Sequence, residues 1–152
     1  MALITGAGRP RGIGRASALQ LARAGADVAV TDLVRNNAEQ QSLDAVVAEI
    51  RSAGGSAVGI AMDVTDRARI SDCVARIHKQ FGAIDILFNN AGSPVGVGPF
   101  LELTDTQWDV SYQVHIKGMV DVCREVIPIM QRRGGGVIIN NASLAGLGAE
   151  PL

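Results

Sequence analysis

Apolar residues follow two different periods along this chain. Short, mostly apolar runs of four to six residues alternate with longer stretches in which apolar residues return every three or four positions. The short runs indicate buried β-strands, and the longer stretches indicate amphipathic helices. The strands are predicted at Ala2–Thr5, Asp27–Thr31, Ala57–Met62, Ile84–Phe88 and Val137–Asn140.

Four helices are predicted between these strands. Their spans are Gly12–Ala24, Ala38–Ala53, Asp66–Phe81 and a long last helix that runs from Thr104 toward Ile129. A glycine follows each of the first three, as expected at a helix C-terminus: these are Gly25, Gly54 and Gly82. Thr104 and Gln107 have the spacing of a capping box, and Pro128 is expected to kink or end the last helix.

The alternation of short strands and helices predicts an α/β protein. Parallel strands with right-handed crossovers give a doubly wound, Rossmann-like sheet in the order 3-2-1-4-5, covered on both faces as a three-layer α/β/α arrangement. We expect residues 1–152 to form a single dinucleotide-binding domain to which the natural protein adds further residues. Without those residues, the fifth strand and the last helix are expected to expose apolar surface.

Composition and charge exclude several classes of function. The chain is 47% hydrophobic with a net charge of −1, which argues against disorder and gives no attraction to nucleic acid or to an anionic membrane. The sequence shows no leader and no apolar run that could span a membrane, so we expect a cytoplasmic protein. Cys73 and Cys123 lack metal-site spacing, so we expect small core residues in a reducing compartment and no metal.

A glycine-rich turn follows the first strand. The segment Thr5–Gly14 reads TGAGRPRGIG. It does not match G-x-G-x-x-G because Arg11 stands where the third glycine belongs, but the spacing Gly8-x-x-x-Gly12-x-Gly14 is present. Glycines let the backbone approach a pyrophosphate at the positive end of a helix. The alternative is a structural turn without a ligand.

With the motifs that end the other strands, this turn resembles the short-chain dehydrogenase/reductase family. The resemblance covers nearly the whole chain and is carried by Thr5-Gly6, Gly12-Ile13-Gly14, Asp32, Asp63-Val64, Asn89-Asn90-Ala91-Gly92 and Ser143. It implies an oxidoreductase that transfers a hydride between a nicotinamide and a small alcohol or ketone. It also implies a homo-oligomer, a dimer or tetramer, that forms through the helix beginning at Thr104.

The resemblance also implies a set of cofactor-binding residues: Gly6, Gly8, Arg11, Gly12, Ile13, Gly14, Asp32, Leu33, Asp63, Val64, Asn90, Ala91 and Gly92. Asp32 follows the second strand, where a carboxylate accepts the hydroxyls of the adenosine ribose and repels a 2′-phosphate. This favours NAD over NADP. Arg11 is similar to a basic residue in NADP-preferring members, so NADP is the alternative. Asp32 as a simple turn residue is the non-functional interpretation.

Two candidate catalytic residues follow from the same resemblance. Ser143 occupies the place of the family's catalytic serine, which holds the substrate oxygen. His115 stands where the family usually has an asparagine of a proton relay; the alternative is a histidine packed beneath the sheet edge. The family's Tyr-x-x-x-Lys is not present, since the single tyrosine, Tyr112, lies five residues before Lys117 on another helix. We therefore expect this chain alone to be inactive. A cofactor-binding or interaction module without catalysis is the alternative function.

Overall fold

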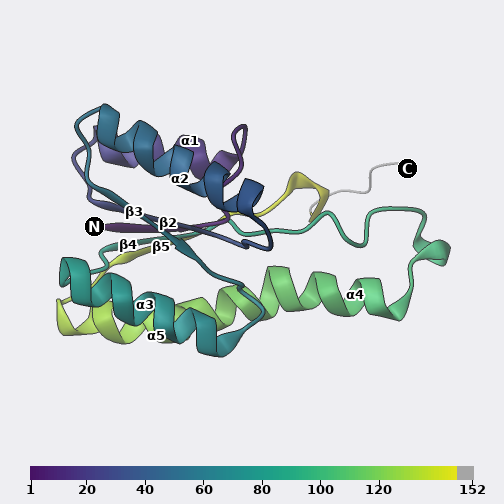
Figure 1. The fold of residues 1–152 in the computed structure, drawn as a ribbon. Coiled ribbons are helices and arrows are strands. Elements are labelled where there is room, and N and C mark those ends of the chain that lie inside the picture. The colour runs from purple at the N-terminus through teal and green to yellow at the C-terminus, as the bar shows by residue number, and fades with distance from the viewer. Residues whose placement is uncertain (147–152) are drawn as a thin grey trace.

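The computed structural model describes residues 1–146. One parallel sheet has the strand order β3-β2-β1-β4-β5 and lies between two layers of helices (Figure 1). The strands are β1 Ala2–Thr5, β2 Val28–Asp32, β3 Ala57–Ala61, β4 Ile86–Asn89 and β5 Val137–Asn140. The predicted class, strand order and three-layer arrangement are confirmed.

The helices occupy the predicted positions, with one subdivision. They are α1 Ile13–Arg23, α2 Asn37–Ser52, α3 Arg67–Phe81, α4 Asp105–Tyr112 and α5 Met119–Arg132, and a π-helical segment over Gln113–Gly118 joins the last two. Short 3₁₀ turns lie at Phe100–Glu102 and Leu144–Gly146. The predicted long last helix is therefore continuous in path but wider in its middle.

Each face of the sheet has its own core. Leu3 of β1 packs in a cluster with α3 and α5, to which Ile70 and Val126 belong. The next residue, Ile4, packs on the opposite face with Leu43 of α2. Because successive strand residues point to opposite faces, β1 is buried on both sides and reads as a continuous apolar run.

The edge strand β5 is covered on one face only. Ile138 packs against the cluster beneath α3 and α5. On the other face, Val137 and Ile139 are 55% and 47% exposed. Ile139, Phe88 and Leu21 line an open apolar groove of about 380 Å³ beside α1. The expected exposure of apolar surface on the fifth strand is thus confirmed.

The predicted helix ends agree with the structure except at Pro128. Gly25, Gly54 and Gly82 have φ values of 92°, 85° and 71°, the left-handed conformation of a helix stop. The capping box between Thr104 and Gln107 is formed. In contrast, α5 continues past Pro128 to Arg132, so of the two predicted effects of this proline, a kink or an end, the end is wrong and the kink stays a prediction.

The continuation past Pro128 has a packing explanation. A proline inside a helix costs about 3 kcal/mol. The next two residues, Ile129 and Met130, are only 6% and 4% exposed. Burying two such side chains contributes roughly 1.5–3 kcal/mol each, which offsets the cost of the proline.

The two cysteines are free thiols within this core. Burial raises the pKa of the Cys73 thiol to about 12, so it stays protonated and unreactive. Cys123 lies on α5 and is half-buried. Residues 1–146 contain no group of three or more His, Cys, Asp or Glu placed to hold a metal ion. Within the same range, no helix has the length and apolar character needed to cross a bilayer.

Candidate functional site

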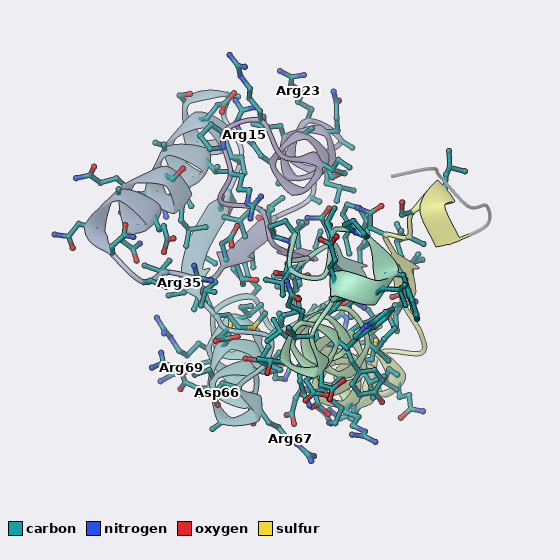
Figure 2. The ribbon with its side chains drawn as sticks, turned by 90° about the vertical axis from the view of Figure 1, so that its right-hand side faces the viewer. Arg15, Arg23, Arg35, Asp66, Arg67 and Arg69 are labelled. Atoms are coloured by element: carbon teal, nitrogen blue, oxygen red, sulfur yellow. The ribbon has the colours of Figure 1, made fainter. Side chains whose placement is uncertain are left out.

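The predicted site residues gather where the parallel strands end. The carboxyl ends of the strands form the edge of the sheet that faces the viewer in Figure 2. The chain leaves β1 toward β2 on one side and returns to β4 on the other, and such a reversal point is where doubly wound sheets bind ligands. A cleft of about 760 Å³ opens there. The predicted residues that line it are Ile13, Val64, Asn90, Ala91, Gly92, His115 and Ser143.

The ends of β1 and β4 are held together by side chains. The buried Thr5 hydroxyl oxygen accepts hydrogen bonds from the backbone N–H groups of Asn90 and Ala91, both at 3.0 Å. The Asn90 side-chain amide donates to the carbonyl oxygens of Thr5 and Gly6, at 3.0 and 2.9 Å. Thr5 thus belongs to the candidate site, although sequence reasoning did not assign it a role there. The available signal was a hydroxyl residue directly before the first glycine of the turn.

Two glycines of the turn are required by close packing. A Cβ atom on Gly14 would lie 2.6 Å from both the Asn90 amide nitrogen and the Gly6 carbonyl oxygen. Gly6 has a φ of +65°, and a Cβ there would lie 2.7 Å from the Cα of Ala91. By contrast, a Cβ on Gly12 would meet only Arg9, at 3.3 Å or more. The turn is thus pressed against the end of β4 at Gly6 and Gly14 and open at Gly12.

The start of α1 is free to accept an anion. Its N-cap is Gly12, no side chain caps it, and its first turn carries no acidic residue. The first N–H groups of a helix have no intrahelical partner and lie at the positive end of its dipole. A phosphate is the ligand that this arrangement binds best.

Asp32 ends β2 beside the glycine turn. One carboxylate oxygen accepts from the Gly8 N–H at 2.7 Å, and the other accepts from the Leu33 N–H at 2.8 Å. A Cβ on Gly8 would lie 3.0 to 3.3 Å from the Asp32 side chain. The carboxylate therefore ties β2 to the turn as well as facing the edge of the sheet. Arg11 is exposed, and no ion pair joins it to Asp32 within residues 1–146.

The rim near α2 and α3 carries three arginines among acidic residues. Figure 2 shows Arg35 on the loop after β2 and Arg67 and Arg69 at the start of α3. The Arg69 guanidinium lies 3.4 Å from the Asp66 carboxylate. Arg35 and Arg67 form no ion pair in the described part of the chain. The Arg35 guanidinium lies near this edge and gives a phosphate-bearing ligand an attractive approach, whereas Arg67 points away from the sheet in Figure 2.

The segment after β3 contacts the π-helical segment. The Asp63 carboxylate accepts from the backbone N–H and the hydroxyl of Thr65, at 2.9 and 2.7 Å, which shapes the turn locally. A Cβ on Gly118 would lie 2.7 Å from the Val64 carbonyl oxygen. Gly118 thus lets the helix approach the Val64 backbone, and Val64 forms one wall of the cleft.

Four asparagines join the ends of β4 and β5. The Asn89 amide donates to the Asn140 side-chain oxygen at 2.9 Å, which ties β4 to β5. The Asn141 amide donates to the Asn90 side-chain oxygen at 3.0 Å. Ser143 lies two residues after Asn141 and is exposed on the wall of the cleft. The asparagines therefore set where Ser143 lies relative to the turn.

His115 reaches the cleft from the π-helical segment. Its Nε2 atom lies 3.0 Å from the Ser93 carbonyl oxygen and 3.3 Å from the Ser93 backbone nitrogen. A Cβ on Gly92 would lie 3.0 Å from the His115 ring. The ring is exposed and packs over the loop that follows β4, so the alternative of a histidine packed beneath the sheet does not hold.

Comparison with known proteins agrees with this geometry. The family described as short chain dehydrogenase matches residues 1–152. A sorbitol dehydrogenase of Cereibacter sphaeroides is 40% identical over 152 residues, which cover 99% of this chain and 55% of that protein. The peroxisomal multifunctional enzyme A of Dictyostelium discoideum is 41% identical over 149 residues, which cover 95% of this chain and 32% of that protein.

The solved structures give the same result. A metagenomic short-chain oxidoreductase, crystallised in complex with NADP, superposes with a TM-score of 0.85 at 35% identity. The match covers 99% of this chain and 64% of that one. The chain therefore spans about half the length of its first curated relative and less than two thirds of this solved structure.

Proposed function

The chain belongs to the short-chain dehydrogenase/reductase family, and from that premise we propose that it carries the dinucleotide site of an oxidoreductase acting on a small alcohol or ketone. The observation that carries the proposal is the glycine turn. Gly14 packs against the end of β4, and the uncapped start of α1 lies beside it. A bound NAD or NADP would supply hydride transfer, while this chain holds the dinucleotide and orients the substrate.

The described residues fit such a dinucleotide in order along the sheet edge. The turn and the start of α1 face the pyrophosphate, and Asp32 faces the adenosine ribose. Asp63 and Val64 border the adenine. Asn90, Ala91 and Gly92 run along the nicotinamide half toward Ser143. These roles follow the family pattern, and the Thr5–Asn90 hydrogen bonds support them because they lock the two strands that the dinucleotide crosses.

NAD is the proposed cofactor and NADP the alternative. A 2′-phosphate near the Asp32 carboxylate would bring two like charges together, which is costly. The unpaired Arg35 and the exposed Arg11 act in the opposite direction, since each attracts a phosphate. We expect the carboxylate to dominate because its position is fixed by two backbone N–H donors, whereas both arginine side chains are exposed and would lose conformational entropy on binding a phosphate.

The substrate site is proposed between Ser143 and His115. The Ser143 hydroxyl would hold the substrate oxygen, and His115 would take part in moving the proton. No Asp, Glu, Lys or Arg lines this cleft within residues 1–146. A neutral alcohol or ketone suits such a wall better than a carboxylate or phosphate, for which a cationic partner would be needed.

Association into a homo-oligomer is proposed through α4. Trp108, Val110, Tyr112 and Ile116 are each 38% to 56% exposed along this helix and the π-helical segment. Sedimentation at tens of micromolar should show a dimer or tetramer, and Val110→Lys should shift it toward monomer. Ile139→Lys, on the open face of β5, is the matched control that separates this helix from non-specific association. A clean wild-type monomer would contradict the proposal.

The alternative function is a cofactor-binding or interaction module without catalysis. The observation that favours it is the lack of Tyr-x-x-x-Lys in these 152 residues. A general acid typically raises the reaction rate about 10²–10⁴-fold, and a serine hydroxyl is too weak an acid to take the place of the missing tyrosine. We expect no turnover from residues 1–152 alone.

An extended chain that carries Tyr-x-x-x-Lys should reduce small ketones with NADH, and Ser143→Ala should remove most of that activity. Substantial turnover by the short chain would assign the acid to another group, with His115 first.

Fluorescence titration with NADH and NADPH tests the cofactor site directly. Wild type should bind NADH more tightly than NADPH, and Asp32→Ala should reverse or remove the preference. Gly12→Val should abolish binding with little change in stability, because the open side of Gly12 faces only Arg9. Gly14→Val should abolish binding and also lower stability, because a side chain there would collide with Gly6 and Asn90. Equal wild-type affinities would refute the ribose assignment, and unchanged binding in Gly12→Val would refute the phosphate site.

A further inference from the structure

The Asn90 side chain links the glycine turn to the segment that carries Ser143. Its nitrogen Nδ2 donates to the carbonyl oxygens of Thr5 and Gly6, at 3.0 and 2.9 Å. Its oxygen Oδ1 lies 3.0 Å from the Asn141 side-chain nitrogen. A carbonyl oxygen can only accept, so the Asn90 atom that faces the turn is the nitrogen and the atom that faces Asn141 is the oxygen. Asn141 is therefore the donor in the second bond.

Asn141 is attached to the end of β4 by its backbone as well as by its side chain. Its backbone N–H donates to the Asn89 carbonyl oxygen at 2.9 Å, which continues the ladder between β4 and β5. Ser143 follows two residues later, and its carbonyl oxygen accepts from the Gly146 N–H at 3.1 Å, so that a turn begins there. Ser143 thus lies between a doubly attached residue and a turn. A shift of Asn141 would move the Ser143 hydroxyl relative to the glycine turn.

We propose that Asn141 is a positioning residue for Ser143: its side-chain amide, bonded to Asn90, holds the serine hydroxyl at a fixed place relative to the glycine turn. The use of that placement rests on the proposed function, in which the turn holds the dinucleotide and Ser143 holds the substrate oxygen. The placement itself does not rest on it. A reacting group held about 1 Å out of place can react about 10²-fold more slowly. The bond to Asn90 therefore serves to fix the substrate oxygen relative to the bound dinucleotide.

The buried asparagine pair lies on the other face of the sheet. The Asn89 amide, which joins β4 to β5, also lies 3.4 Å from the Cys123 sulfur of α5. Successive residues of a strand point to opposite faces, so Asn90 and Asn141 lie on the face covered by α1. A Cβ on Gly14, in the first turn of α1, would lie 2.6 Å from the Asn90 amide nitrogen. The exposed pair is thus the one that meets the glycine turn, and the buried pair joins the strands.

Backbone ¹⁵N relaxation of the ligand-free protein tests the placement without any cofactor. Asn141→Leu keeps the size of the side chain and removes its N–H donors. We expect the order parameter of the Ser143 amide to fall from about 0.85, the value of rigid backbone, toward the flexible range below about 0.6. The Ala91 amide, which donates to the Thr5 hydroxyl oxygen, is the control and should keep its value. An unchanged order parameter at Ser143 would overturn the proposal.

A double-mutant cycle in the extended chain that carries Tyr-x-x-x-Lys tests the role in catalysis. Asn141→Leu should lower kcat for ketone reduction about fivefold to tenfold, the equivalent of one hydrogen bond. The KM and the dissociation constant for NADH should stay the same, because the bonds from Asn90 to the turn remain. In a Ser143→Ala background the same substitution should have no further effect, since no hydroxyl is left to place. An equal loss in both backgrounds, or an unchanged kcat in Asn141→Leu, would refute the positioning role.

Two further measurements separate this inference from the proposed function and from a structural role. Full activity in Ser143→Ala, or no binding of NADH by wild type, would refute the proposed function, and the relaxation experiment would still decide whether Asn141 places Ser143. Asn141→Leu should unfold at nearly the same urea concentration as wild type, because Asn141 is exposed. A loss of stability as large as that of Asn89→Ala would show a structural role and refute the inference.

Discussion

The strands β1 and β5 have similar sequences but opposite surroundings. Ala2–Thr5 and Val137–Asn140 are both four residues long and mostly apolar. Every residue of β1 is buried, whereas three of the four in β5 are exposed. β1 is hydrogen-bonded on both sides, to β2 and β4, and β5 to β4 alone. Position in the sheet, and not apolar content, decides how much each strand stabilises the fold.

This difference divides the candidate site into two halves. The half proposed to bind the dinucleotide extends from β1 and β2, which are central and covered. The half proposed to be catalytic, with Ser143, follows the exposed edge strand. The asparagine bonds between β4 and β5 are therefore the main side-chain connection that relates the two halves. We expect substitutions to affect the two halves very differently.

The largest difference should appear when one apolar side chain in each strand is shortened to alanine. Leu3 is fully buried, so Leu3→Ala should lower the free energy of unfolding by about 2–5 kcal/mol. Ile139→Ala is the matched control on the edge strand and should cost less than about 1 kcal/mol, since Ile139 is 47% exposed. Urea denaturation measures both. Similar losses would mean that the open face of β5 is covered in solution.

A smaller effect is expected at the joint between the halves. Asn89 is 7% exposed and donates to the Asn140 side-chain oxygen, so Asn89→Ala should cost about 1–3 kcal/mol because it removes this hydrogen bond and leaves a cavity where the buried Asn89 side chain packed. Asn141→Ala, at an exposed position, should cost no more than about 1 kcal/mol and serves as the control. Equal effects on urea denaturation would show that the buried bond is not the stronger link.

The smallest effect is expected at Asp121 of α5 and concerns the stability of the fold at low pH. The hydrogen bond from Lys117, with a second from Arg124, holds the pKa of the Asp121 carboxyl below its usual range. A depressed carboxyl pKa contributes stability that is present above the unfolded-state pKa, about 3.9, and is lost as the pH falls through the folded-state value. In Asp121→Asn the free energy of unfolding should therefore fall less between neutral pH and pH 3 than it does in wild type. Urea denaturation at a series of pH values measures this dependence. An unchanged acid limb would show that the ion pairs contribute nothing to folding.

Much of the fold could be predicted from the sequence because burial on both faces leaves a plain signal. The runs around Ile4, Val30 and Ile60 have few polar residues and are bounded by glycine, serine or aspartate. The predicted strand boundaries differ from the observed ones where a buried residue does not pair with a neighbouring strand. Ile84 is fully buried but precedes β4, which begins at Ile86. An apolar pattern reports burial and not backbone pairing.

The site was predictable in its parts but not in its connections. Asp32 and Ser143 follow strands and were assigned from the motif pattern. The sequence did not indicate that Asp32 is held by the Gly8 N–H or that Thr5 receives two backbone donors from β4. Such bonds join residues far apart in the chain and have no local period. The widening of the helix at Gln113–Gly118 was missed for the same reason, since α-helical spacing continues on both sides of it.

The strand order also has a consequence for how fast the chain folds. β1 is made first but lies at the centre of the sheet, where Ala2 pairs with Ile86. β1, β2 and β3 can associate as soon as residue 61 is available. The other side of β1 must wait for β4, and bringing it back closes a long loop before any contact compensates for the lost entropy. We therefore expect the pairing of β1 with β4, and with it the Thr5–Asn90 bonds of the ligand edge, to form in the rate-limiting step of folding.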